Sequence, residues 1–126
     1  MIARVLVVDD DEQLRRAMAT SLTRAGFEVF TADDGPPAML LTATFDLVVV
    51  DFNLKAGATG DEVVRHFKAR FGARVYCAVL SGEDDHHVRS ICLDAGADDV
   101  FVKPASPVEL KRRLVAAAEA LRGLAA

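Results

Sequence analysis

Side chains able to carry out chemistry follow short apolar runs at four places in this 126-residue sequence. In chain order they are Asp9-Asp10-Asp11-Glu12, Asp51, Ser81 and Lys103. Carboxylates gathered at one point favour Mg²⁺, which binds a few carboxylates, keeps several waters and commonly takes phosphate oxygens. Lysine and serine suit phosphoryl oxygens, and an aspartate can serve as a nucleophile that carries an acyl phosphate. The pattern predicts Mg²⁺-dependent phosphoryl chemistry, provided that the fold brings these side chains together.

The elements that must position these residues alternate along the chain. Apolar runs predict five strands, at residues 5–8, 27–30, 47–50, 75–80 and 100–102. Apolar stripes of helical period predict helices over residues 14–25, 63–71, 88–95 and 110–121. Asp11 suits the N-cap of the first helix. Two later helices begin with a capping box, formed by Thr59 with Glu62 and by Ser106 with Glu109. The second helix, at Pro36-Pro37, is the least defined.

Five strand-then-helix units favour an α/β fold with a doubly wound, five-stranded parallel sheet. Short connections and right-handed crossovers place helices on both faces of such a sheet. Its chemistry lies outside the carboxyl ends of the strands, and neighbouring strands are about 5 Å apart. We therefore expect one shallow cleft that contains Asp9, Asp10, Asp51, Ser81 and Lys103.

Composition limits the classes of function. The 15 Lys and Arg against 19 Asp and Glu give a net charge of −4, which disfavours direct binding to nucleic acid. The 52% hydrophobic content excludes disorder. The sequence contains no uncharged apolar run of about 18 residues, so it predicts no membrane span. The N-terminus does not resemble a secretory signal. Cys77 and Cys92 imply no disulfide framework. We expect a cytoplasmic protein whose residues 1–126 form one domain.

The quoted positions and their neighbours resemble the receiver domains of two-component response regulators, of the chemotaxis-regulator type. The resemblance extends from Val5 to about Leu121. It rests on the motifs Val7-Val8-Asp9-Asp10, Asp46-Leu47-Val48-Val49-Val50-Asp51, Leu80-Ser81-Gly82, Gly96-Ala97-Asp98-Asp99 and Val102-Lys103-Pro104. It implies a flavodoxin-like (βα)5 fold with strand order 2-1-3-4-5, and it assigns residues 1–126 to one receiver domain.

The resemblance also implies a role for each member of the acid cluster. Asp51 matches the phosphoacceptor, which takes a phosphoryl group from the phosphohistidine of a sensor kinase. Asp10 and Asp51 match direct Mg²⁺ ligands, whereas Asp9 matches an acid that usually holds the ion through water. Asn53 matches a position that contributes a backbone carbonyl to the metal.

Further implied roles concern switching and phosphoryl lifetime. Ser81 matches the switch hydroxyl that turns toward the phosphoryl group. Lys103 matches the lysine that pairs with that group, and family members often have a cis bond before the residue that matches Pro104. Asn53 and Glu83 match two positions associated with the rate of self-dephosphorylation.

Three features depart from the family pattern, one of which is Pro36-Pro37 at the start of the second helix. The family usually has Tyr or Phe three residues before the lysine, where this chain has Val100. Val100 has no ring to swing between exposed and buried positions, and strand alternation directs the adjacent Phe101 to the opposite face. The loop after the acceptor commonly has Pro four residues on and Gly eight residues on. This chain has Lys55 and Thr59 there, with Gly60 one place later, so we expect a loop one residue longer.

The expected function is therefore a phosphorylation-controlled relay. The resemblance implies phosphorylation by a sensor histidine kinase or a phosphotransfer protein. The signal would pass to a downstream effector protein or a separate output domain, through the face formed by the helix at 88–95, the strand at 100–102 and the helix at 110–121. The chain would assist its own phosphorylation and dephosphorylation without turning over an external substrate. We expect no output segment on this chain.

Three other functions fit part of the pattern. A small phosphatase of the haloacid dehalogenase type would use Asp9-x-Asp11, a hydroxyl, a lysine and Mg²⁺, but it needs a further acidic pair beyond Lys103. Only Glu109 and Glu119 lie there. A flavodoxin-like cofactor binder would need a hydroxyl-rich phosphate loop where this chain has four acids. The third alternative is a binding module with a receiver fold that does not switch.

Overall fold

The computed structural model of the chain describes residues 3–55, 57–82 and 86–125. Its centre is one sheet of five parallel strands in the order β2-β1-β3-β4-β5. The strands are β1 (Arg4–Val8), β2 (Glu28–Ala32), β3 (Leu47–Asp51), β4 (Tyr76–Ser81) and β5 (Asp99–Val102). The predicted doubly wound α/β fold with strand order 2-1-3-4-5 is confirmed.

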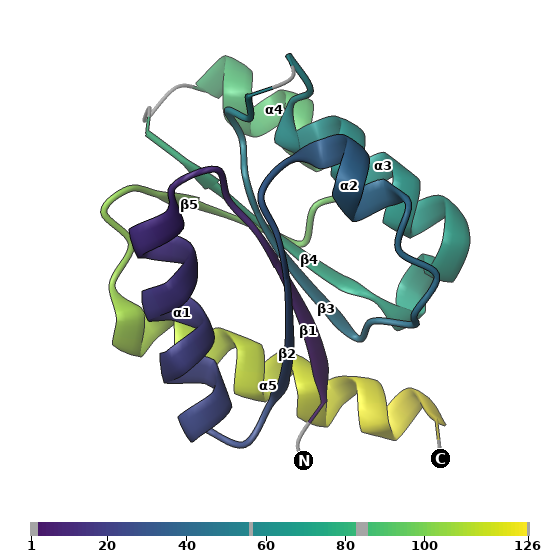
Figure 1. Ribbon diagram of the computed structural model, residues 1–126. Helices are drawn as coiled ribbons and strands as arrows, with labels where there is room; N and C mark the ends of the chain where they lie inside the picture. Colours follow the sequence, from purple (N-terminus) through teal and green to yellow (C-terminus); the bar gives the residue numbers. More distant parts are fainter. Residues whose placement is uncertain (1–2, 56, 83–85, 126) are drawn as a thin grey trace.

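Helices cover both faces of the sheet (Figure 1). One face carries α1 (Glu12–Arg24) and α5 (Pro107–Ala125). The other face carries α2 (Gly35–Met39), α3 (Gly60–Phe71) and α4 (His86–Asp94), and the short 3₁₀ helix η1 (Gly72–Arg74) precedes β4. None of the described helices combines the length and the apolar character needed to cross a membrane.

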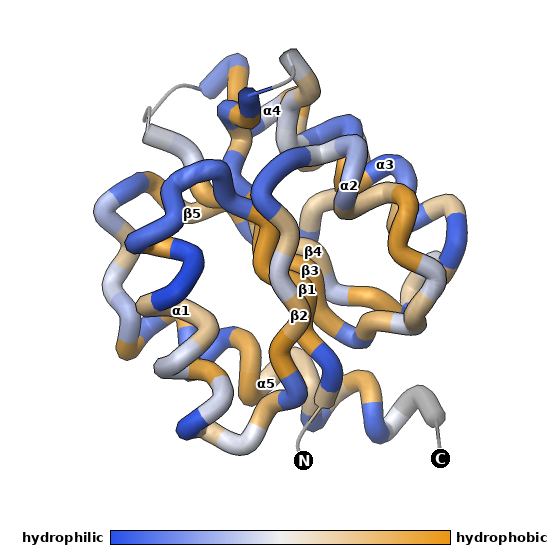
Figure 2. Tube along the Cα trace, in the orientation of Figure 1, coloured by the Kyte–Doolittle hydropathy of each residue, from blue (hydrophilic) through white to orange (hydrophobic). Residues whose placement is uncertain are grey.

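Two apolar cores lie on opposite faces of the sheet, because successive side chains of a strand point in opposite directions. On the α1 and α5 side, strand residues such as Val7 pack with Leu22 and Leu114. On the other side, strand residues such as Val8 pack with Val64 and Phe67. The central strands are accordingly hydrophobic along most of their length (Figure 2). Because both faces of the sheet are buried, its position is fixed between the helices. The polar residues lie at the carboxyl edge of the sheet.

The predicted helix starts are present. Asp11 is the N-cap of α1, where its carboxylate accepts from the backbone N–H groups of Gln13 and Leu14 at 3.0 and 3.1 Å. Ser106 Oγ accepts from the backbone N–H of Glu109 at 3.3 Å at the start of α5. At the start of α3, the Thr59 N–H donates to the Glu62 carboxylate at 3.2 Å.

The second helix is short. Pro36 and Pro37 occupy its first turn, where backbone N–H groups have no intrahelical partner and proline is tolerated. The irregular segment that follows α2 is held by Arg70 of α3, which donates to the carbonyls of Leu41 and Thr42 at 2.8 and 3.2 Å. The Arg70 guanidinium also lies 4.5 Å from the centre of the Phe71 ring.

The two neighbours on β5 face opposite sides, as predicted. Val100 packs against the core under α3 and α4. Phe101 packs against the core under α1 and α5. No ring therefore stands at position 100, and the adjacent aromatic side chain belongs to the other layer of the molecule.

Candidate functional site

Three carboxylates meet at the carboxyl edge of the sheet. Asp9 follows β1 and Asp51 ends β3, and these strands are neighbours with Val8 paired to Val50. Each of Asp9, Asp10 and Asp51 offers a carboxylate oxygen within 4.8 Å of the other two. The convergence predicted from strand ends is therefore present in the structure.

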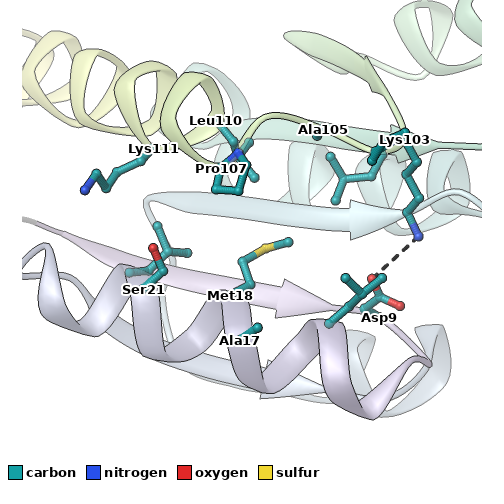
Figure 3. A pocket seen from close by; sticks show the side chains of 13 residues that line it. Asp9, Ala17, Met18, Ser21, Lys103, Ala105, Pro107, Leu110 and Lys111 are labelled. Atoms are coloured by element: carbon teal, nitrogen blue, oxygen red, sulfur yellow. Dashed lines mark ion pairs between the residues drawn. The ribbon is translucent and has the colours of Figure 1, made fainter.

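Lys103 brings the positive charge of this edge. Its Nζ lies 3.1 Å from Asp51 Oδ1 and 3.7 Å from Asp9 Oδ2, and Figure 3 shows the second of these pairs. The Lys103 backbone N–H donates to the Ser81 carbonyl at 2.6 Å, and the Lys103–Pro104 peptide bond is cis. The end of β4 and the loop after β5 thus hold this ammonium over the acids.

The acids are buried despite their charge. Asp9 is 1% exposed and Asp51 is 6% exposed. Burial raises the pKa of the Asp51 carboxyl, Lys103 opposes this rise, and the charges of Asp9 and Asp10 add to it. Like charges about 4 Å apart repel by roughly 1–4 kcal/mol, depending on the local dielectric. One ammonium therefore leaves the negative charge of three carboxylates undercompensated.

The acid group suits a hard divalent cation. Asp9 Oδ1 accepts from the backbone N–H of Asp11 at 2.9 Å, but the buried Asp9 Oδ2 has no hydrogen-bond partner among the described residues. A buried polar atom without a hydrogen bond is costly in free energy. Carboxylate oxygens are the ligands that Mg²⁺ prefers, so both the donor set and the orphaned oxygen fit that ion.

The remaining predicted site residues lie around this group or outside the described chain. Ser81 ends β4 and is 1% exposed. Asn53 lies two residues after Asp51, is exposed, and forms an isolated antiparallel bridge with Thr59. Glu83 lies outside the described residues. The roles assigned to these three residues stay predictions.

Arg15 of α1 is a site neighbour that is not among the residues singled out from the sequence. Its guanidinium Nη1 donates to the backbone carbonyl of Asp9 at 2.8 Å, and the residue is half-buried. The contact ties the second turn of α1 to the loop that carries Asp9 and Asp10. No sequence signal indicates it, because the bond joins a side chain to a backbone atom six residues earlier.

Gly60 is a second residue whose importance comes from packing. A Cβ atom there would lie 2.9 Å from the Asp51 carbonyl oxygen and 2.9 Å from Phe52 Cα. The Gly60 N–H donates to the Phe52 carbonyl at 2.8 Å. Only glycine fits this approach of α3 to the end of β3.

The acids beyond Lys103 are occupied elsewhere. Glu109 pairs with Arg112 at 3.1 Å and with Arg113 at 3.3 Å along α5. Glu119 is exposed on the same helix. This arrangement disfavours a phosphatase of the haloacid dehalogenase type, which needs a further acidic pair beside its lysine.

Comparison with known proteins gives consistent matches. The sequence model of the response regulator receiver domain matches residues 5–115. The uncharacterized transcriptional regulatory protein YrkP of Bacillus subtilis is 38% identical over 117 residues, which cover 92% of this chain and 49% of YrkP. A cyclic di-GMP phosphodiesterase of Thermotoga maritima is 39% identical over 108 residues, which cover 86% of this chain and 28% of that protein.

Solved structures agree with the sequence matches. The BeF3-activated receiver domain of DrrB from Thermotoga maritima superposes with a TM-score of 0.86 at 28% identity. The match covers 94% of this chain and 99% of that domain. The chain thus has nearly the full extent of a solved receiver domain, but it spans about half the length of YrkP.

Proposed function

This chain belongs to the family of response regulator receiver domains, and we propose that it is phosphorylated on Asp51 in a Mg²⁺-dependent reaction. Receiver domains of response regulators pair with histidine kinases and effector output domains. The observation that carries the proposal is the 3.1 Å contact of Lys103 Nζ with Asp51 Oδ1, beside the carboxylates of Asp9 and Asp10.

The proposed reaction is a transfer of one phosphoryl group. A carboxylate oxygen of Asp51 attacks the phosphorus of a phosphohistidine, and the bond between phosphorus and the imidazole nitrogen breaks. The electron pair of that bond stays on the nitrogen, which takes up a proton. The Lys103 ammonium then donates a hydrogen bond to a phosphoryl oxygen, and the Ser81 hydroxyl turns toward the phosphoryl group. The protein mainly positions the groups and stabilises charge.

The acid cluster would hold the metal. Asp10 and Asp51 would be direct ligands, Asp9 would act through water, and the Asn53 backbone carbonyl would be a further ligand. Bound Mg²⁺ supplies the positive charge that offsets the carboxylates and the phosphoryl oxygens. Arg15 would hold the backbone of Asp9 in place through its 2.8 Å hydrogen bond.

The proposed signal leaves through the face formed by α4, β5 and α5. A sensor histidine kinase or phosphotransfer protein would phosphorylate the chain, and an effector protein or separate output domain would respond, without direct binding of the chain to nucleic acid.

We assign residues 1–126 to one receiver domain and place it in the cytoplasm, in keeping with the free, buried Cys77 and Cys92. The domain would turn over no external substrate, and Asn53 and Glu83 would tune its self-dephosphorylation.

Phosphorylation of Asp51 is tested by intact mass spectrometry. Incubation with acetyl phosphate and Mg²⁺ should add one phosphoryl group to the wild-type chain and none to Asp51→Asn. Asp46→Asn is a matched control, because Asp46 caps the Arg4 backbone N–H at 2.9 Å on the opposite edge of the sheet. Equal mass gain in wild type and Asp51→Asn would contradict the proposed acceptor.

Metal binding is tested at Asp10. Asp10→Asn removes one carboxylate from the group, so the Mg²⁺ concentration for half-maximal phosphorylation should rise at least tenfold. Titration of Mg²⁺ against the phosphorylation rate measures this value. Exposed Asp33→Asn serves as the control, and a rate that does not depend on Mg²⁺ in the wild type would contradict the proposed metal site.

A further inference from the structure

The strand that carries Lys103 is a short edge strand. β5 has four residues, pairs with β4 alone and ends directly before Lys103. In the observed register its first residue, Asp99, is paired with Ala78 of β4. A shift of one residue along β4 would move the strand by about 3.3 Å, which is more than the 3.1 Å between Lys103 Nζ and Asp51 Oδ1. The position of the ammonium therefore depends on the register of β5.

The hydrophobic pattern of β5 specifies this register only weakly. Val100 packs under α3 and α4, and Phe101 packs under α1 and α5, so both faces of the strand are apolar at its centre. A slip of one residue moves each side chain of a strand to the opposite face. In β5 such a slip would exchange one apolar side chain for another. Contacts of a different kind must therefore hold the strand in place along β4.

Asp98, directly before β5, is bonded to both β4 and α3. Its Oδ2 accepts from the Cys77 N–H at 2.8 Å and from Lys68 Nζ at 2.9 Å, and its own N–H donates to the Cys77 carbonyl at 2.8 Å. Lys68 Nζ also donates to the Val75 carbonyl at 2.6 Å. Exposed ion pairs contribute little to stability, but the Lys68 side chain is only 19% exposed and its partner carboxylate also bonds a backbone N–H. These bonds together match only the observed register.

Asp99 is held on the other face of the sheet. Its Oδ2 accepts from the hydroxyl of Tyr76, the first residue of β4. Arg113 Nη1 of α5 lies 3.8 Å from the same oxygen. Burial and the Asp99 carboxylate raise the pKa of the Tyr76 phenol above its ordinary value, so the phenol keeps the proton that it donates. The amino end of β5 is thus tied to α3 on one face and to α5 on the other.

We propose that Lys68 and Tyr76 act as positioning residues for Lys103. By holding the two acids at the amino end of β5 they fix the register of the strand, and the strand then places the ammonium at Asp51. A misplacement of about 1 Å can lower the rate of a reaction by about a hundredfold. The effect on rate rests on the proposed phosphorylation of Asp51, but the register exists in the unphosphorylated protein and is measured there independently.

Hydrogen exchange of the full chain without metal or phosphodonor tests the register. The Lys103 N–H donates to the Ser81 carbonyl of β4 at 2.6 Å, so its exchange reports the carboxyl end of β5. In Lys68→Met and in Tyr76→Phe this exchange should accelerate at least fivefold more than that of the amides of β3, which report general destabilisation. Arg4→Met is the matched control, because it removes a 3.3 Å ion pair between β1 and β2, and it should show no such difference. Equal acceleration in β3 and at Lys103, or unchanged exchange at Lys103, would overturn the inference.

Phosphorylation rates separate positioning from a general structural role. With acetyl phosphate and saturating Mg²⁺, Lys68→Met and Tyr76→Phe should each lower the rate constant at least fivefold, and Arg4→Met less than twofold. In a Lys103→Ala background the first two substitutions should change the rate less than twofold, since no ammonium remains to be misplaced. An equal loss in both backgrounds would overturn the inference. A wild type that takes up no phosphoryl group would instead contradict the proposed function, and hydrogen exchange would still decide whether these residues set the register.

Discussion

The Asp51 carboxylate lies in surroundings that disfavour its own charge. It is 6% exposed, has Asp9 and Asp10 as neighbours, and has one compensating partner in Lys103 at 3.1 Å. A nearby cation would lower the repulsion among these three carboxylates. Phosphorylation would add further negative charge at Asp51, so the proposed chemistry increases the need for a bound cation.

Removing this charge should stabilise the metal-free protein. In the presence of a chelator at neutral pH, Asp51→Asn should raise the free energy of unfolding by about 1–3 kcal/mol, because burial, together with the charges of the other two acids, disfavours the Asp51 carboxylate more than Lys103 favours it. Chemical denaturation measures this difference. Asp46→Asn, which removes a backbone cap on the other edge of the sheet, should instead lower stability.

The pH dependence of this difference has a defined sign. The pKa of folded Asp51 is raised above its ordinary value of 3.8, so the folded state binds the proton more tightly than the unfolded state. The contribution of Asp51 to stability is therefore lost as pH rises from about 3.8 through the folded pKa. The advantage of Asp51→Asn should grow over that window and then level off; an advantage largest at low pH would contradict this picture.

Among the elements, β3 and α3 approach each other closely at the site. Gly60 brings the first turn of α3 against the backbone of Asp51 and Phe52, with no room for a Cβ atom. The capping contact between Thr59 and Glu62 fixes the start of the same helix. The start of α3 is therefore held against β3 by backbone contacts of Gly60 as well as by its own capping.

Substitution at this junction should separate packing from helix propensity. Gly60→Ala should destabilise the fold by about 1–3 kcal/mol, because its Cβ would overlap backbone atoms that cannot move independently. Gly123→Ala is the matched control, since a Cβ there meets nothing within 4 Å and alanine favours helix by up to about 1 kcal/mol. Denaturant midpoints measure both, and equal effects would contradict the packing explanation.

At the scale of the whole molecule, one sheet separates two apolar layers, and the acid cluster lies at the carboxyl edge of that sheet, between the two layers. Val100 packs into the layer of α3 and α4, and Phe101 packs into the layer of α1 and α5. Lys103 follows both on the same strand end. Movement of Lys103 toward a phosphoryl group would therefore change the packing of α4 and β5, although no aromatic ring at position 100 can change its position.

Beryllofluoride with Mg²⁺ tests whether the molecule switches. If phosphorylation shifts the packing of α4 and β5, hydrogen exchange should change in these elements and not in α3. Asp51→Asn, which lacks the proposed acceptor, should show no change. Equal exchange with and without beryllofluoride in the wild type, despite bound Mg²⁺, would favour the binding module that does not switch.

Sequence alone determined the sheet and the meeting of its polar ends. Apolar runs such as 47–50, separated by helical stripes, allow few arrangements other than a parallel sheet. In that sheet Asp9 and Asp51 must end adjacent strands, so their proximity follows from topology. The starts of α1 and α5 were equally predictable, because Asp11 and Ser106 bond to backbone groups within one turn of themselves.

Tertiary structure decided what depends on atoms brought together from separate segments. The hydrogen bond of Arg15 to the Asp9 carbonyl and the absence of room for a Cβ atom at Gly60 have no periodic signature in the chain. Local patterns specify which face of an element is buried, but the distance between two packed elements depends on the volumes of all the side chains between them. The acid cluster therefore follows from the order of the strands, whereas the close approach at Gly60 follows from packing.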